Sequence, residues 1–181
     1  MNRYPSTYRN DENSESISIA YIHDVISRAT FPQIDARNLQ SLDVRLPDAF
    51  AGERNIVMIA FQRQHQSLVD SWVPWLEKMS ASDDGLRFYE IPTIGRMWAP
   101  ARRFIDGGMA AAIRIPAILQ RTFTVYGDVS RLTTPLGITD RSTITVVLVD
   151  DEGQVHWQRT GGFTPAIAAE LEAALDVLRS E

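Results

Sequence analysis

The chain has 181 residues, 44% of them hydrophobic, which is enough for one domain with a sizeable core. Lys and Arg total 18 and Asp and Glu total 23, and the net charge of −5 argues against general nucleic-acid binding. The chain contains no cysteine, which excludes disulfides, thiolate nucleophiles and thiolate metal sites.

The N-terminal residues are polar. Residues 1–15 are rich in Asn, Ser, Glu and Tyr and are predicted to form a flexible arm, followed by a short amphipathic helix over 17–29. The start of the chain has no apolar signal region, and nowhere do about 18 apolar residues run together. We therefore expect a cytoplasmic protein without a membrane span.

The next part of the chain predicts a hairpin and then a buried strand. Short alternating pieces at 33–36 and 42–46 flank a turn-prone stretch, which indicates a hairpin. IVMIAF (56–61) is a continuous apolar run typical of a central strand. Apolar residues from Leu68 to Met79 recur at helical spacing around Pro74, which predicts a kinked helix.

The second half of the chain alternates strands with helices. One helix is expected from Pro100, interrupted by Gly107-Gly108, and the last begins with Thr164 as its N-cap. A short helix or turn is expected at 129–138. Strands are predicted at 86–91, 122–127, 142–150 and 154–160, the last two joined by the turn DDEG.

Alternating β and α units predict an α/β fold with a mainly parallel sheet and an antiparallel edge hairpin. We expect one domain over 16–181, with an N-terminal extension and hairpin at 16–54 and a core at 55–181. The three histidines, His23, His65 and His156, lie far apart and show no metal-ligand spacing. Neither a metal nor another cofactor is therefore predicted.

Three stretches resemble the thioredoxin fold, in particular the peroxiredoxin branch that carries an N-terminal hairpin. They are FPQIDARNL, VRLPDAFAGERNIVMIAF with the proline-containing helix after it, and TITVVLVDDEGQVHW. The resemblance covers about residues 31–181. It implies a three-layer sandwich, in which helices cover both faces of a central mixed sheet.

The resemblance also assigns a position to the reactive cysteine of that fold. In thioredoxins this cysteine lies five residues after the aromatic residue that ends the strand and eight residues before the kinking proline. Here the fifth residue after Phe61 and the eighth residue before Pro74 are the same residue, Gln66. The second cysteine position holds Val69, and Ser142-Thr143 stands where the family has a cis-proline. Without a thiolate, we expect neither thiol redox nor peroxidase activity.

A narrower resemblance concerns AFQRQHQSLVDSWVPWLE, YEIPTIGRMWAPARRFIDGGMAAAI and the VLVDDEG hairpin. Together they look like the thioredoxin-like assembly factors for the membrane sector of ATP synthase, known from mitochondria, and their bacterial relatives. This resemblance implies a partner-binding or chaperone-type role. It also implies ATP synthase subunits as partners, and a place at the periphery of the inner membrane as an alternative location.

The loop after the first core strand is one candidate site. It holds Gln62, Arg63, Gln64, His65 and Gln66 at a strand end beside a helix N-terminus, where open α/β sheets bind ligands and where the helix dipole favours anions. The alternative is a solvated loop in which Gln66 or Ser67 caps the helix. His65 is a poor candidate for a general base, because no Ser or Cys nucleophile lies in an obvious motif beside it.

Residues 94–121 form a second candidate, with five arginines against one aspartate in a chain of net negative charge. This segment could receive an acidic partner, or its arginines could pair with Asp83-Asp84 and Asp150–Glu152. Trp98 is the tryptophan best placed for a contact, whereas Trp72 and Trp75 are expected in the core. The predicted contact surface is Arg96, Trp98, Arg102, Arg103 and Asp106, with Gln62–Gln66 adjacent.

These observations predict a redox-inactive thioredoxin-like protein that binds a protein partner and is not expected to be an enzyme. One alternative is a small-ligand-binding protein or non-thiol enzyme that uses the loop after the first core strand. Another is a homodimer formed through the N-terminal arm and hairpin.

Overall fold

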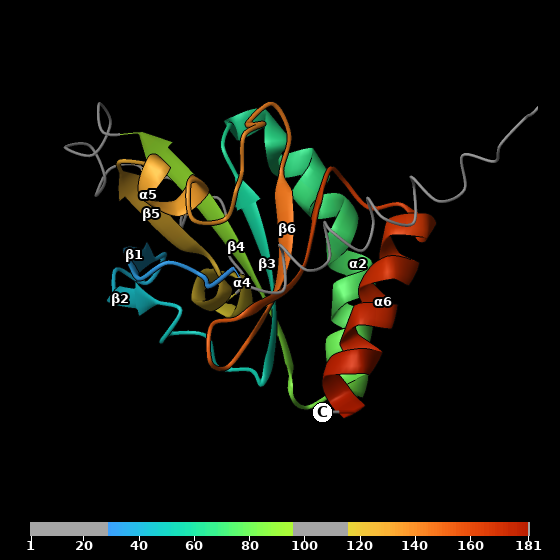
Figure 1. The fold of residues 1–181 in the computed structure, drawn as a ribbon. Coiled ribbons are helices and arrows are strands. Elements are labelled where there is room, and N and C mark those ends of the chain that lie inside the picture. Colours follow the sequence, from blue (N-terminus) through green and yellow to red (C-terminus); the bar gives the residue numbers. More distant parts are fainter. Residues whose placement is uncertain (1–28, 96–115, 181) are drawn as a thin grey trace, which may run out of the picture.

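The computed structural model of the chain describes residues 29–95 and 116–180 (Figure 1). These residues form a seven-stranded sheet with the order β2-β1-β5-β4-β3-β6-β7. The strands are β1 (Ile34–Asn38), β2 (Asp43–Leu46), β3 (Arg54–Ala60), β4 (Leu86–Gly95), β5 (Phe123–Gly127), β6 (Thr145–Asp150) and β7 (Val155–Thr160). The helices are η1 (Arg63–His65), α2 (Gln66–Ser82), α4 (Pro116–Arg121), α5 (Ser130–Thr133) and α6 (Pro165–Ser180).

The sheet is mixed. β4 runs parallel to both of its neighbours, β3 and β5, whereas the other neighbouring strands pair antiparallel. The expectation of a mainly parallel sheet is therefore wrong. The physical reason is that the chain adds a tightly connected hairpin at each edge, β1-β2 beside β5 and β6-β7 beside β3, and short connections make strands antiparallel.

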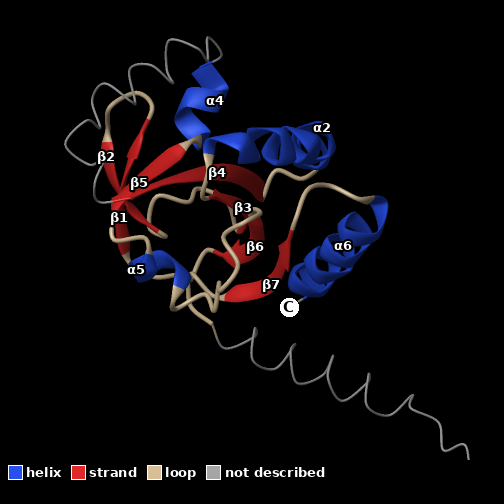
Figure 2. Cartoon of the chain, turned by 90° about the horizontal axis from the view of Figure 1, so that it is seen from above, coloured by secondary structure: helices blue, strands red, loops and turns tan. Residues whose placement is uncertain are grey.

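Helices α2 and α6 lie side by side on one face of the sheet (Figure 2). Each buries one stripe of side chains at helical spacing against β3, β4 and β6. The stripe of α2 is Val69, Trp72 and Leu76, and that of α6 is Ala168, Leu171 and Leu175. The expectation that Trp72 packs in the core is confirmed, since its ring is fully buried and Trp75 packs partly buried against it.

The opposite face is covered by α5 and by loops. Leu132 from α5 joins residues of the sheet in a second apolar cluster. Phe50, from the loop after β2, stacks on Tyr89 at a ring-centroid distance of 4.9 Å and meets Phe31 edge-on at 5.3 Å. Apolar layers on both faces of the sheet agree with the expected three-layer sandwich.

Several boundaries differ from those predicted. β4 continues through Pro92 to Gly95, past the predicted end of this strand at 91. Pro92 is tolerated because it pairs last with β3, opposite Ala60, and pairing with β5 begins only at Thr93. β6 begins at Thr145, later than the predicted 142, because the backbone of Ser142 makes other hydrogen bonds.

The two long helices begin differently. Thr164 caps α6 as predicted, since its hydroxyl accepts a hydrogen bond from the N–H of Ile167 at 3.2 Å. The predicted cap of α2 by Gln66 or Ser67 is wrong: α2 follows directly from the 3-10 turn of η1, and its N-cap residue His65 makes no side-chain cap bond. The helices predicted at 17–29 and from Pro100 fall almost entirely outside the described residues.

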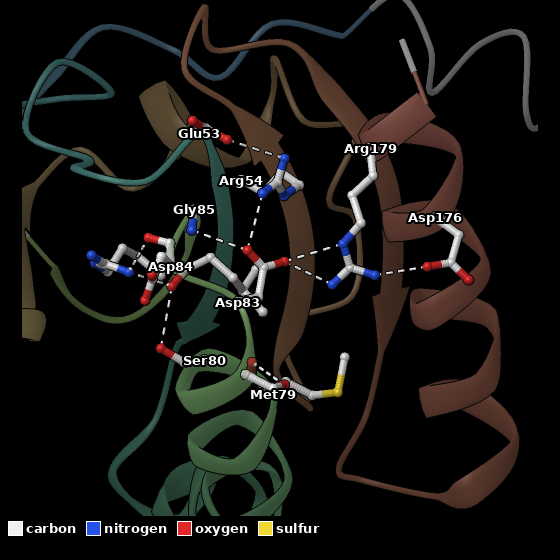
Figure 3. Close-up of polar contacts among 12 residues, drawn as sticks. Glu53, Arg54, Met79, Ser80, Asp83, Asp84, Gly85, Asp176 and Arg179 are labelled. Carbon is white, nitrogen blue, oxygen red and sulfur yellow. Dashed lines mark hydrogen bonds and ion pairs between the residues drawn. The ribbon is translucent and has the colours of Figure 1, made fainter.

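The sheet end away from the loop 62–66 carries a network of ion pairs (Figure 3). Asp83, which ends α2, accepts hydrogen bonds from Arg54 of β3 at 3.0 Å and from Arg179 of α6 at 2.7 Å. The N–H of Gly85 donates to the same carboxylate at 3.0 Å. One carboxylate thus joins a strand and the ends of two helices.

None of the helices within residues 29–95 and 116–180 is both long and apolar enough to cross a membrane.

Candidate functional site

The loop 62–66 leaves the carboxyl end of β3 and leads through η1 into α2. Four of its side chains, Gln62, Arg63, Gln64 and Gln66, are exposed. His65 is different, because it is only 2% exposed. The loop therefore presents three amides and a guanidinium to solvent and turns its one imidazole inward.

Both ring nitrogens of His65 are engaged. Nδ1 accepts a hydrogen bond from the backbone N–H of Phe61 at 3.3 Å, and Nε2 lies 3.1 Å from the carbonyl oxygen of Ser142. Since an N–H faces Nδ1 and a carbonyl faces Nε2, the geometry requires the neutral tautomer with its hydrogen on Nε2. His65 therefore joins the loop after β3 to the segment before β6, and neither nitrogen is available as a base.

One further hydrogen bond joins the same two segments, and local bonds support each of them. Gln62 donates from Nε2 to the carbonyl oxygen of Arg141 at 3.2 Å, and Gln64 donates to the side-chain oxygen of Gln62. The N–H and the hydroxyl of Ser142 both donate to Asp140, at 2.8 and 2.7 Å. These bonds from Ser142 lower the pKa of the Asp140 carboxyl.

Ser142 occupies the place that the resemblance assigns to a cis-proline. Within the described residues, the cis peptide bond is Leu46–Pro47, in the loop after β2. The segment before β6 is held instead by the side chains of His65 and Gln62, which donate hydrogen bonds to the carbonyl oxygens of Ser142 and Arg141.

The first turn of α2 holds a further polar group. Gln66 donates from Nε2 to Asp70 at 3.0 Å, and its side chain lies near the carboxyl of Glu90, which is in β4 opposite Met58. Burial raises the pKa of Glu90, and the negative charge of Asp70 adds to this, while the Gln66 amide and Arg121 oppose it. Gln66, at the position that the resemblance assigns to the first cysteine, thus lies beside two carboxyl groups.

The residues predicted for the site did not include Asp70, Glu90 or Asp140, and Ser142 was named only at the place of the cis-proline. Two of them leave a signal in the sequence: Asp70 stands four residues after Gln66 on the same helix face, and Glu90 interrupts an apolar strand. The spacing of Asp140 and Ser142 is typical of a local side-chain turn. That these groups surround the loop follows only from the fold.

The predicted contact surface of Arg96, Trp98, Arg102, Arg103 and Asp106 lies outside the described residues. Of the five arginines in the segment 94–121, Arg121, at the end of α4, is the one within the described residues. Its guanidinium lies 4.1 Å above the centre of the Phe88 ring, and Nη2 is 3.5 Å from Glu77. Arg121 therefore pairs with neither of the two acidic stretches that the sequence offered as partners.

An open groove of about 530 Å³ lies elsewhere, on β1, β2 and β5. Neither Arg63 nor His65 lines it; its residues are Asp35, Ala36, Arg37, Asp43, Val44, Arg45, Thr124 and Tyr126. Within the part of the chain that the structure describes, no group of three His, Cys, Asp or Glu side chains is placed to hold a metal ion.

Solved structures resemble this fold. A thioredoxin domain of a thiol-disulfide oxidoreductase from Bacteroides vulgatus matches with a TM-score of 0.53 at 21% identity, over 80% of this chain and 96% of that one. A thiol:disulfide interchange protein from a Bacteroides species gives 0.52 at 22%, over 72% and 79%. The pneumococcal exposed lipoprotein thioredoxin from Streptococcus pneumoniae strain TIGR4 gives 0.51 at 13%, over 82% and 99%.

These likenesses show that the chain has a thioredoxin-like fold. No protein-family model matches the chain, and no curated protein matches it. The two Bacteroides neighbours are a thiol-disulfide oxidoreductase and a thiol:disulfide interchange protein by their titles, whereas this chain has no cysteine.

Proposed function

We propose that this chain is a redox-inactive thioredoxin-like protein that binds a protein partner through the surface around the loop 62–66. The observation that carries the proposal is the state of that loop. It keeps the position of a thioredoxin active site without a thiol, and hydrogen bonds from His65 and Gln62 hold it in one conformation. A fixed surface with no reactive group suits recognition, because binding to a preformed surface costs little ordering entropy.

The charges around the loop favour an acidic partner. Arg63 and Arg141 are both exposed, and among the described residues neither guanidinium pairs with a carboxylate. Arg141 donates instead to the hydroxyl of Thr133 at 3.0 Å. Two exposed guanidiniums can form bidentate bonds with carboxylates of another protein. On the sequence alone, Arg102 and Arg103 extend this contact surface.

The resemblance to assembly factors makes ATP synthase subunits the first partners to test. We also propose that the protein works in the cytoplasm or, as the resemblance implies, at the periphery of the inner membrane. Fractionation of native cells into soluble and membrane parts tests that location.

The function is tested by affinity purification of the tagged full chain from its native cells, followed by mass spectrometry. We expect a partner that co-purifies with the wild type and with Lys78→Glu, a matched charge reversal at an exposed site on α2. The same partner should be lost from Arg63→Glu/Arg141→Glu and from Arg102→Glu/Arg103→Glu. Retention of every partner by both double variants would show that neither surface binds. ATP synthase subunits among the lost proteins would support the assembly role.

A further inference from the structure

The amide of Gln66 lies beside two carboxyl groups. A hydrogen bond runs from Nε2 to Asp70, four residues along α2, at 3.0 Å, and the carboxyl of Glu90 in β4 lies near the same side chain. An amide NH₂ has two hydrogens and can donate to two acceptors. Position 66 is thus built to receive a hydrogen-bond donor.

The same position would be unfavourable for a thiolate. Reactive cysteines lie near positive charge, such as Lys, Arg or a helix N-terminus, because the thiolate is the reactive form. The N-terminus of α2 supplies a partial positive charge here, but Asp70 and Glu90 place two carboxylates around the side chain. The cation that acts on Glu90, Arg121, is shared with Glu77 and with the Phe88 ring.

We infer that Asp70 and Glu90 reserve position 66 for a hydrogen-bond donor and disfavour a thiolate there. The fold is therefore redox-incompetent in its electrostatics as well as in its composition. A neutral thiol at this position can donate its S–H to a carboxyl oxygen, whereas ionisation would place a further negative charge beside Asp70 and Glu90. Restoring a cysteine alone will not restore a reactive thiol. This inference deepens the redox-inactive half of the proposed function and does not depend on a partner.

The test uses Gln66→Cys, which carries a single thiol because the wild type has none. The rate of alkylation by iodoacetamide is measured from pH 6 to pH 11, and the midpoint of the profile gives the thiol pKa independently of access to the sulfur. Gln64→Cys is the matched control, since residue 64 is exposed on the same loop and its side chain contacts an amide and no carboxylate. At pH 7 we expect Gln66→Cys to react about tenfold more slowly than this control, which corresponds to one pKa unit.

Removing the two charges should reverse the effect. Asp70→Asn and Glu90→Gln, each added to Gln66→Cys, are expected to lower the midpoint and together to recover about tenfold in rate at pH 7. Asp70 is exposed, so Asp70→Asn tests the inference even if Glu90→Gln impairs folding. A Gln66→Cys midpoint at or below that of Gln64→Cys, or one unmoved by both neutralising changes, overturns the inference. Because no partner takes part, either result leaves the purification experiment to decide the proposed function separately.

Discussion

At the scale of single residues, His65 decides the shape of the candidate surface. Its ring is buried and bridges the N–H of Phe61 and the carbonyl of Ser142. Phe61 is four residues away from His65 in the sequence, and Ser142 is 77 residues away. The sequence placed His65 in the right loop and on the right strand end. It could not show the inward direction of the ring, because the acceptor belongs to a segment far away along the chain.

Replacing His65 should destabilise the protein. His65→Ala leaves the part-buried N–H of Phe61 and carbonyl of Ser142 without their partner and opens a cavity where the buried ring was, so we expect a loss of about 2–4 kcal/mol in the free energy of unfolding. Urea denaturation measures this. Gln64→Ala, at an exposed neighbour, should cost less than about 0.5 kcal/mol. Equal effects of the two changes would mean that the bridge contributes no stability.

At the scale of elements, the two long helices show what local sequence can specify. Thr164 and Pro165 mark the start of α6 in the sequence, since a capping hydroxyl and an N1 proline act within the first turn of a helix. No such local signal marks the start of α2. That helix follows directly from β3 and the 3-10 turn of η1, and the packing of its buried stripe against the sheet fixes its position.

The cap of α6 gives a prediction at this scale. Thr164→Ala removes the acceptor for the N–H of Ile167, and we expect a loss of about 1 kcal/mol in the free energy of unfolding. Thr164→Ser keeps the hydroxyl and should lose less. Thermal unfolding followed by circular dichroism compares the two, and a Thr164→Ser variant as unstable as Thr164→Ala would argue against the cap.

At the scale of the whole molecule, Asp83 joins β3, α2 and α6 (Figure 3). Its side chain is 11% exposed. Burial alone raises the pKa of Asp83, but the hydrogen bonds from Arg179, Arg54 and the Gly85 N–H outweigh it, so that the pKa is lowered. A carboxyl whose pKa is lowered by folding stabilises the protein at neutral pH, and this contribution is lost as the pH falls through the folded-state pKa.

The network therefore predicts a pH-dependent effect of Asp83→Asn. At pH 7 the variant should lose about 2–3 kcal/mol in the free energy of unfolding, since the largely buried guanidinium of Arg54 and the more exposed one of Arg179 both lose their carboxylate. The difference from the wild type should shrink below about pH 4, where Asp83 becomes protonated. Asp84→Asn, at an exposed neighbour, is the control for the loss of one negative charge. A pH-independent difference would show that charge at Asp83 is not the cause.

The sequence by itself determined the thioredoxin-like class, the order of most strands, the buried stripes of α2 and α6 and the absence of a thiol. The class rests on the resemblance of three stretches to that fold, whereas the other features depend on periodicity, local capping and composition, which neighbouring residues specify. Only the tertiary structure decided which strands pair parallel and which antiparallel, the bridge of His65 to Ser142 and the placement of Gln66 beside Asp70 and Glu90. Contacts of this kind join residues from different strands and helices, and their partners become neighbours only when the sheet is assembled.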